Sequence, residues 1–413
     1  MAKRNSANNQ TDIKRGNVEA VFNTIAESGG ISRARLSKTL SLSRSTVTVI
    51  VDGLKSKGLV IDTGVCDEAS SGVGRTAFAV NVNSADNYIA VAEASIDTIN
   101  CAAFDLKTDQ VAAESLTYKI NETPMADAIV SCARQLAAGL AGKKIWALGC
   151  IYSGSSGFID YRTQKFQLID TSGLSSYGFS AAELSGKLGI PVCIYEGAIV
   201  LGMMEHRKYH RASKTFAYLY ISDGVCVNIF QEGELLRGAY GPMSEFGHMS
   251  VNLAGPRCVC GNRGCLEMYV SNRALVQYYA ELRGKAPYGA RPEIAIASDL
   301  AAALPSWGEI VDRHAGGDPV AGEAVAKLND AMAVGVINLI NLINPDTVVL
   351  GGTASRYGEG FLERIRQKVS ASAVEQYRES TAIAYARHDG GIIAPGVAHD
   401  AQRQNVASIL FPE

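Results

Sequence analysis

Three cysteines and one histidine lie close together in this sequence, in a spacing that suits metal binding. They are His248, Cys258, Cys260 and Cys265, all within eighteen residues. Thiolate sulfur and imidazole nitrogen are the ligand set of closed, four-coordinate zinc sites, and the glycines between the last two cysteines let the chain turn tightly. Ordinary buried thiols are the competing interpretation. Three cysteines within eight residues favour zinc, and the site is expected to be structural because protein fills all four positions.

The remaining cysteines form no framework. They are scattered at Cys66, Cys101, Cys132, Cys150, Cys193 and Cys226. Nine is an odd total, which favours reduced thiols and a cytoplasmic location. The chain has no N-terminal signal pattern. Its best apolar stretch, residues 331–350, is interrupted by three asparagines and Pro345, so we expect no membrane span.

Charge is unevenly distributed along the 413 residues. Residues 1–60 hold ten Lys or Arg against four acids, a balance of 10 − 4 = +6, which leaves 29 − 37 = −8 for the rest. A basic N-terminal module on an acidic body is expected where only that module meets a polyanion. A solvated positive surface without a partner would give the same balance. The length suits two or three domains, and the 47% hydrophobic fraction suits a large core.

Local patterns in the basic module predict three short helices. Residues 17–28 carry apolar side chains at helical spacing and end at two glycines. Ser32 is expected to cap a helix over 33–40, and Ser43 a helix over 44–57 that Gly58 stops. The first sixteen residues, rich in Asn, Ser and Lys, are expected to be a loose arm.

The last two helices and the segment after them predict a winged helix-turn-helix. The third helix buries Val47 and its apolar neighbours, which leaves the polar side chains of its first turns free to enter the major groove of DNA. Residues 59–61 and 76–82 look like two strands around a flexible turn, a wing that would contact the DNA backbone or minor groove. The predicted DNA-binding residues are Arg44, Ser45, Thr46, Thr48 and Arg75. A single module binds weakly, so we expect a homodimer or tetramer on a pseudo-palindromic operator.

From residue 87 onward, strand-like and helical segments alternate. Paired strands are expected at 88–94 and 98–104, a helix at 125–140, a buried strand at 145–152, and a strand and helix at 191–195 and 198–207. A second half follows a similar order, with strands at 215–221 and 225–231, a long helix at 318–343 and a strand at 347–350. This order predicts two α/β lobes with a cleft between them.

The metal segment, with the flanking Glu245 and Glu267, resembles the signature of the ROK family of sugar-responsive repressors, open reading frames and sugar kinases. Residues 42–47 and 74–76 resemble the winged helix-turn-helix of ROK repressors. The resemblance implies an actin-like, sugar-kinase-like fold after the DNA-binding module. We therefore expect a winged helix-turn-helix domain at 1–84, a first ROK lobe at 85–205, and a second lobe at 206–413 with the zinc loop and the C-terminal helices.

Measured against that family, the residues for phosphoryl transfer are missing. ROK kinases carry an Asp-Ile-Gly-Gly-Thr phosphate loop where this chain has Glu93-Ala94-Ser95-Ile96-Asp97, and a Gly-Thr-Gly loop where it has Ser222-Asp223-Gly224. Carboxylates therefore stand where phosphates would lie. The catalytic Asp of the kinases falls on Gly197, which cannot act as a base. We expect no kinase activity and no catalytic residues.

The sugar-binding residues of the family are only partly matched. The resemblance assigns ligand binding to Glu245, His248, Glu267, Gly157, Ser172 and Glu196. Two carboxylates beside a metal-fixed imidazole can hydrogen-bond vicinal hydroxyls. Alternatively, Glu245 and Glu267 serve only to support the metal loop.

The resulting expectation is a sugar-responsive transcriptional regulator of carbohydrate uptake or catabolism genes, acting as a repressor on operator DNA. A sugar or sugar derivative in the cleft would shift the spacing of the two DNA-binding modules. Two alternatives stay open: a regulator controlled by a protein partner, and a ROK sugar kinase that carries a DNA-binding domain.

Overall fold

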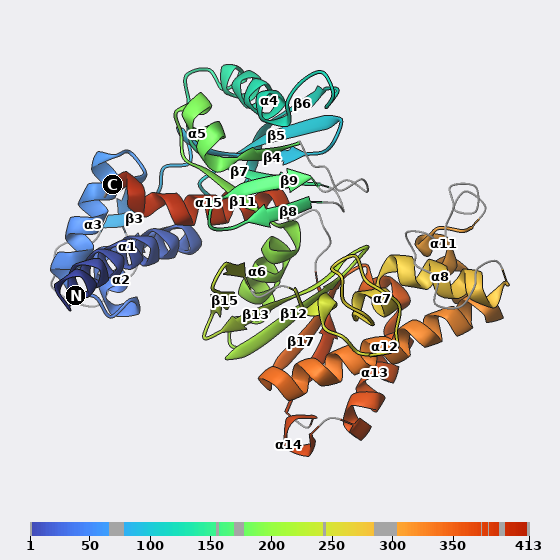
Figure 1. The fold of residues 1–413 in the computed structure, drawn as a ribbon. Coiled ribbons are helices and arrows are strands. Elements are labelled where there is room, and N and C mark those ends of the chain that lie inside the picture. The colour runs from blue at the N-terminus through green and yellow to red at the C-terminus, as the bar shows by residue number, and fades with distance from the viewer. Residues whose placement is uncertain are drawn as a thin grey trace. The chain divides into compact units, whose positions relative to one another are not determined.

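The structure is a computed structural model that describes residues 2–65, 78–153, 157–168, 177–242, 245–284, 304–372, 374–378, 380–387 and 393–410. The chain divides into two compact units, whose elements Figure 1 labels. The first unit is Met1–Gly197 together with Ile393–Glu413, and the second is Ala198–Ile392. The second unit is thus an insertion into the first: the chain enters it once, after Gly197, and leaves it once, before Ile393.

The N-terminal helices form where capping and apolar spacing predict them. They are α1 (Ala2–Ser28), α2 (Arg33–Thr39) and α3 (Arg44–Ser56). Ser32 caps α2 by accepting from the amide of Arg35, and Ser43 caps α3 by accepting from the amide of Thr46. The three helices share a fully buried cluster, which includes Val18, Val21, Phe22, Ile25, Leu36, Val47, Val51 and Leu54.

A small antiparallel sheet accompanies these helices. It contains β1 (Ile31–Ser32), β2 (Val60–Val65) and β3 (Phe78–Val82) in the order β1-β3-β2. The two longer strands fall where the wing was predicted. The turn between them, including Arg75, lies outside the described residues.

The prediction of a loose N-terminal arm is wrong, because α1 already begins at Ala2. Residues 2–15 contain neither proline nor glycine. Nothing in that stretch interrupts a helix, so the backbone bonds of residues 17–28 continue toward the N-terminus.

A five-stranded mixed sheet forms the body of the first unit, in the order β11-β7-β4-β5-β6. Its strands are β4 (Asn87–Ala94), β5 (Thr98–Asp105), β6 (Gln110–Thr117), β7 (Lys144–Tyr152) and β11 (Val192–Tyr195). The β4–β7 and β7–β11 pairs are parallel, and the β4–β5 and β5–β6 pairs are antiparallel. Helix α4 (Met125–Gly139) packs on β5 and β6, and α5 (Ala181–Leu188) on β11. A separate three-stranded sheet contains β8 (Gly157–Asp160), β9 (Lys165–Leu168) and β10 (Gly178–Ser180).

The last helix, α15 (Ile393–Leu410), completes the first unit. It packs on β7 and β4 and also contacts α1. Gln402 donates to the Leu106 carbonyl at 3.3 Å, and the fully buried Val397 occupies the space above Gly149 of β7. Assignment of all C-terminal helices to the second lobe is therefore wrong, because the sheet of the first unit buries the apolar face of α15.

The second unit has its own five-stranded sheet, in the order β14-β13-β12-β17-β18. Its strands are β12 (Thr215–Ile221), β13 (Val225–Gln231), β14 (Glu234–Leu235), β17 (Thr347–Gly352) and β18 (Ala382–Tyr385). A ribbon of β15 (Arg237–Gly238) and β16 (Gly241–Pro242) follows β14. Helix α6 (Gly197–Tyr209) lies against β12 and β13, where Asn228 donates to the Ala198 carbonyl at 2.7 Å. The unit therefore starts at Ala198, before the predicted boundary at 205, whereas the boundary expected near residue 84 stays a prediction.

Helices complete the second unit. They are η2 (Glu245–His248), α7 (Glu267–Val270), α8 (Asn272–Leu282), α11 (Trp307–Ala315), α12 (Pro319–Ile343), η3 (Ala354–Tyr357), α13 (Glu359–Ser372) and α14 (Glu375–Arg378). Among the described helices, α12 alone has the length and apolar composition of a membrane span. Its buried side chains belong to the core of this unit, which also takes in side chains of β12, β13 and β17.

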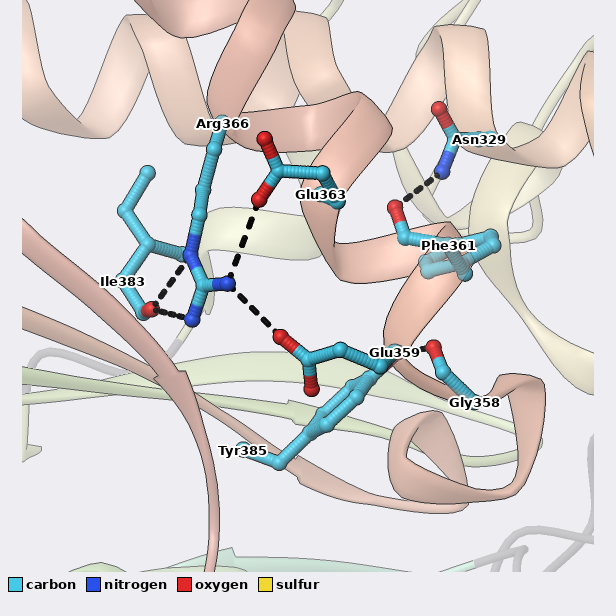
Figure 2. A network of polar contacts seen from close by, with 8 residues as sticks. All are labelled: Asn329, Gly358, Glu359, Phe361, Glu363, Arg366, Ile383 and Tyr385. Carbon is cyan, nitrogen blue, oxygen red and sulfur yellow. Dashed lines mark hydrogen bonds and ion pairs between the residues drawn. The ribbon is translucent and has the colours of Figure 1, made fainter.

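Figure 2 shows how α13 is fixed to the edge strand β18. The Arg366 guanidinium donates through Nε and Nη2 to the Ile383 carbonyl at 3.1 and 2.8 Å, and Nη1 pairs with Glu359 at 2.7 Å. Asn329 of α12 donates to the Phe361 carbonyl of α13 at 2.8 Å. These bonds occupy a carbonyl of an edge strand and hold the helix layer on the sheet.

Docking of α15 on the first sheet can be tested at Gly149. A Cβ at this position would lie 2.2 Å from Cγ1 of Val397, so Gly149→Ala is expected to destabilise the first unit by about 1–3 kcal/mol through overpacking. The measurement is urea unfolding of the single variants and of Gly149→Ala/Val397→Ala. The double variant should be more stable than the sum of the two single losses, because trimming Val397 removes the clash.

Gly186→Ala is the matched control. Gly186 lies in α5 of the same unit with no atom within 4 Å of an added Cβ, so the change should be neutral or stabilising. Strict additivity of the Gly149 and Val397 effects would contradict the proposed packing.

Candidate metal and ligand sites

The four predicted metal ligands converge in the second unit. Their potential ligand atoms all lie within 4.8 Å of one another. The sulfur of Cys258 is 3.5 Å from Nδ1 of His248, and the sulfurs of Cys260 and Cys265 are 3.6 Å apart. Around a tetrahedral ion with metal–sulfur bonds of about 2.3 Å, ligand sulfurs are separated by about 3.8 Å. The His/Cys3 cluster therefore has the donor set and spacing of a closed four-coordinate metal site.

The loop converges because glycine takes the conformations that other residues avoid. Gly261 and Gly264 have φ values of 91° and 65°. At Gly264 a Cβ would lie 1.8 Å from the Asn252 carbonyl oxygen, so no side chain fits there. The Cys258 amide donates to the Asn262 carbonyl at 2.8 Å, and the Gly261 amide to the Cys258 carbonyl at 3.0 Å. These turns bring the thiols to one point.

Two of the three thiols in the cluster, those of Cys258 and Cys265, are buried. Desolvation raises the pKa of the Cys258 thiol, and it raises the pKa of the Cys265 thiol to about 12. Without a positive charge these groups would therefore be neutral at pH 7. A bound cation reverses this balance, because it stabilises thiolates directly.

Two carboxylates accompany the metal cluster. Glu245 begins η2, and its Oε2 lies 3.6 Å from Nε2 of His248, one turn along. Glu267 begins α7, directly after the cysteine loop, and its Oε2 accepts from the Val225 amide at 3.0 Å. Burial raises the pKa of Glu267. The exposed Glu245, the metal-cluster His248 and the largely buried Glu267 thus form one polar group in the second unit.

The other predicted ligand residues belong to the first unit. Glu196 follows β11 and accepts a hydrogen bond from the Tyr161 hydroxyl at 3.0 Å. Gly157 opens β8, where a Cβ would lie 2.2 Å from the ring of Phe166, so packing alone requires glycine there. Ser172 lies outside the described residues. Tyr161 is a candidate ligand residue that sequence reasoning missed, because nothing in the chain marks a contact across 35 positions.

The two turns expected from the sequence to match phosphate loops both carry carboxylates. In the first, Asp97 accepts hydrogen bonds from the Ser95 and Thr98 hydroxyls at 2.8 and 3.1 Å. Those bonds hold the pKa of Asp97 below its ordinary value, so it is ionised at pH 7. In the second, Asp223 lies between Ser222 and Gly224, whose backbones are joined by a 2.9 Å bond. Each turn would therefore repel a phosphate.

The predicted DNA-contacting residues occupy the start of α3. Arg44, Ser45 and Thr48 are exposed, and Thr46 is half-buried. The Ser43 hydroxyl lies 2.8 Å from both the Ser45 and the Thr46 hydroxyls. Within the described part of the chain, the Arg44 side chain forms no hydrogen bond or ion pair, so its guanidinium is free to meet an external anion.

Comparison with known proteins gives one family. The family model described as "ROK family" matches residues 90–398. The xylose repressor of Caldicellulosiruptor bescii is 27% identical over 373 residues, covering 88% of this chain and 89% of the relative. The Escherichia coli K12 DNA-binding transcriptional dual regulator NagC is 24% identical over 371 residues, covering 89% and 87%.

Solved structures agree on the fold. A ROK family transcriptional regulator, described as a homologue of the E. coli MLC protein, superposes with a TM-score of 0.76 at 21% identity and covers 97% of this chain and 98% of its own. The ROK hexokinase of Thermus thermophilus superposes with a TM-score of 0.60 at 21% identity, covering 77% and 98%. At these identities the superpositions establish the architecture alone.

The metal assignment predicts the effect of Cys260→Ser. Serine is a poor ligand for a soft metal site, so we expect the purified variant to lose the metal that the unchanged protein carries in about one equivalent per chain. Elemental analysis after dialysis measures this. Cys226→Ser, a change to a β13 thiol of the same unit outside the cluster, should retain the metal. Equal metal content in both variants would disprove the four-ligand assignment.

Proposed function

Because the chain belongs to the ROK family, we propose that it is a sugar-responsive, DNA-binding transcriptional regulator that represses carbohydrate uptake or catabolism genes and has no kinase activity. One observation carries the proposal. A basic N-terminal module with a capped, outward-facing helix is joined to a ROK body whose phosphate turns hold carboxylates. The proposed location is the cytoplasm.

The N-terminal module is proposed to bind operator DNA as a winged helix-turn-helix. Helix α3 would enter the major groove with Arg44, Ser45 and Thr48 foremost, and Arg75 would contact the backbone or minor groove. The balance of +6 over residues 1–60, from ten basic and four acidic residues, supports contact with a polyanion. Two modules are needed for tight binding, so the active species is proposed to be a homodimer or a tetramer.

The effector is proposed to be a sugar or sugar derivative. Its hydroxyls would bind Glu245, His248 and Glu267 of the second unit. Gly157, Ser172 and Glu196, which belong to the first unit, stay predicted ligand residues. The metal is proposed to be zinc, because three thiolates and one imidazole in a closed tetrahedral set favour it. Zinc would hold the η2 loop in shape and fix the His248 ring that faces the ligand. The relative named as a xylose repressor supports a sugar as effector.

Loss of kinase activity is proposed on three changes. Asp97 and Asp223 lie in the turns that would cradle phosphates, and Gly197 replaces the catalytic Asp that takes the proton from the attacking hydroxyl. Each change acts on a separate requirement of phosphoryl transfer, so restoring one of them would leave the others unmet.

Operator binding is tested by Arg44→Ala. The variant should bind DNA selected by the unchanged protein more weakly, and its affinity should fall less steeply with salt, by about one counterion. The measurement is fluorescence anisotropy between 50 and 200 mM salt, a range over which phosphate contacts change affinity strongly. The melting temperature should stay the same because Arg44 is exposed.

Lys107→Ala is the control for lost charge, since Lys107 is an exposed cation on the β5–β6 turn of the same unit. An equal effect of the two substitutions would mean that overall charge, not α3, attracts the DNA.

The effector site is tested by thermal shift with D-xylose, D-glucose, N-acetylglucosamine, their phosphates and ATP. A bound sugar should raise the melting temperature by mass action, and ATP should not. Glu245→Gln should weaken the response about tenfold, because it removes a charge-assisted hydrogen bond to the ligand.

Glu232→Gln, an exposed carboxylate change in the β13–β14 turn, is expected to leave that response intact. A shift with ATP would restore the kinase interpretation. An unchanged melting temperature with every compound would contradict a sugar effector and favour control by a protein partner.

A further inference from the structure

Helix α3 presents one stripe of side chains to the outside. The stripe contains Ser45, Thr48, Val49 and Asp52. Ser45 is three and four residues before Thr48 and Val49, and Asp52 is four and three residues after them, spacings that align side chains on one face of a helix. The opposite face of the helix is buried in the module core. Val49 is therefore an aliphatic side chain in the centre of the surface proposed to enter the major groove, and it is 72% exposed.

The polar members of the stripe already have partners within the module. The Thr48 hydroxyl donates to the Arg44 carbonyl at 2.8 Å, and the Ser45 hydroxyl lies 2.8 Å from that of Ser43. The Asp52 carboxylate pairs with Arg33 at 2.7 Å. This ion pair offsets a negative charge that would otherwise repel DNA phosphates. The stripe can thus approach DNA, but its hydroxyl groups already form hydrogen bonds within the protein.

Val49 has the opposite character. It has no hydrogen-bonding atom in its side chain, and most of its surface is exposed. A β-branched residue is also a weaker helix former than the straight-chain residues that suit an exposed helix position. Neither helix stability nor packing accounts for valine at this position, whereas an external apolar contact would.

Only one feature of the major groove is apolar. Guanine, adenine and cytosine present hydrogen-bonding groups along their edges, and thymine adds a C5-methyl group. Val49 lies on the second turn of α3, and residues of the first turns of a recognition helix are those that reach base edges.

We propose that Val49 is a specificity-determining residue that reads thymine through the C5-methyl group, an inference that rests on the proposed DNA-binding function. The two methyls of Val49 pack against the thymine methyl and require a T·A pair at that position of each half-site. The guanidinium of Arg44, five residues earlier, supplies affinity through a phosphate or a guanine edge.

The test uses the full-length, metal-loaded protein and a random double-stranded DNA library. The duplex most enriched by the unchanged protein is resynthesised with deoxyuridine in place of each thymine in turn, which removes only the C5-methyl group. At one thymine of each half-site, we expect the affinity of the unchanged protein to fall about fourfold, the effect of one apolar carbon lost from a contact. Val49→Ser should bind the thymine and deoxyuridine duplexes equally.

Val49→Thr, which keeps one methyl, should retain part of the discrimination. Val111→Ser, an exposed valine changed on β6 of the same unit, should discriminate as fully as the unchanged protein. Melting temperatures of all variants are measured alongside and should stay close to that of the unchanged protein, because neither Val49 nor Val111 belongs to the buried core.

The outcomes separate this inference from the function on which it rests. Enrichment of a duplex without a methyl effect at any thymine, or with an effect that persists in Val49→Ser, would overturn the role of Val49 and leave DNA binding in place. Failure to enrich any duplex would overturn both.

Discussion

The packing of α15 on the first sheet is the contact on which the rest of the architecture depends. The helix comes from the end of the chain, yet its buried side chains cover β7 and β4, and it also contacts α1 of the N-terminal module. Gly149 leaves room for Val397, so the sheet and helix approach closely. Because the chain must return for this contact, the second unit is inserted between Gly197 and Ile393. The chain thus passes between the two units at two points, and α15 starts at the second of them.

Solved structures of a ROK transcriptional regulator and a ROK hexokinase share this architecture, and we propose that electrostatics separates the two uses. A phosphate loop works because backbone amides and glycines face an anion. In this chain Asp97 occupies such a turn and is kept ionised by the hydroxyls of Ser95 and Thr98. A carboxylate fixed by two hydrogen bonds cannot easily move aside for a phosphate. The negative charge in this turn is therefore fixed by the hydrogen bonds around Asp97 as well as by the presence of the aspartate itself.

Sequence reasoning succeeded where the determinants are local. Ser43 and the apolar spacing after it are sufficient to place α3, and the close spacing of the cysteines is sufficient to predict a metal cluster that the structure brings together. It failed where the determinant is a distant contact or the absence of a helix-breaking residue. Docking of α15 depends on a sheet formed by residues some 250 positions earlier, and no local pattern records it. Helix α1 extends to Ala2 because residues 2–15 contain no proline or glycine. The polar composition of this segment had instead suggested a loose arm. Likewise, Tyr161 in the turn between β8 and β9 meets Glu196 across 35 positions of the chain.

Glu267 links the metal loop to the second anionic turn. It directly follows the cysteine segment, while its Oε2 accepts from the Val225 amide at the start of β13, next to Ser222-Asp223-Gly224. One oxygen is thus committed to structure, and only the other is left for a ligand. Burial raises the pKa of Glu267, so its carboxyl group takes up a proton more readily than an exposed carboxyl does. In the proposed site, the protonated form would donate to a ligand oxygen, and the ionised form would accept. Metal loss would displace the start of α7 and with it this carboxyl group. In the proposed site, the metal would therefore influence ligand binding indirectly, by fixing a side chain that joins the cysteine loop to the sheet.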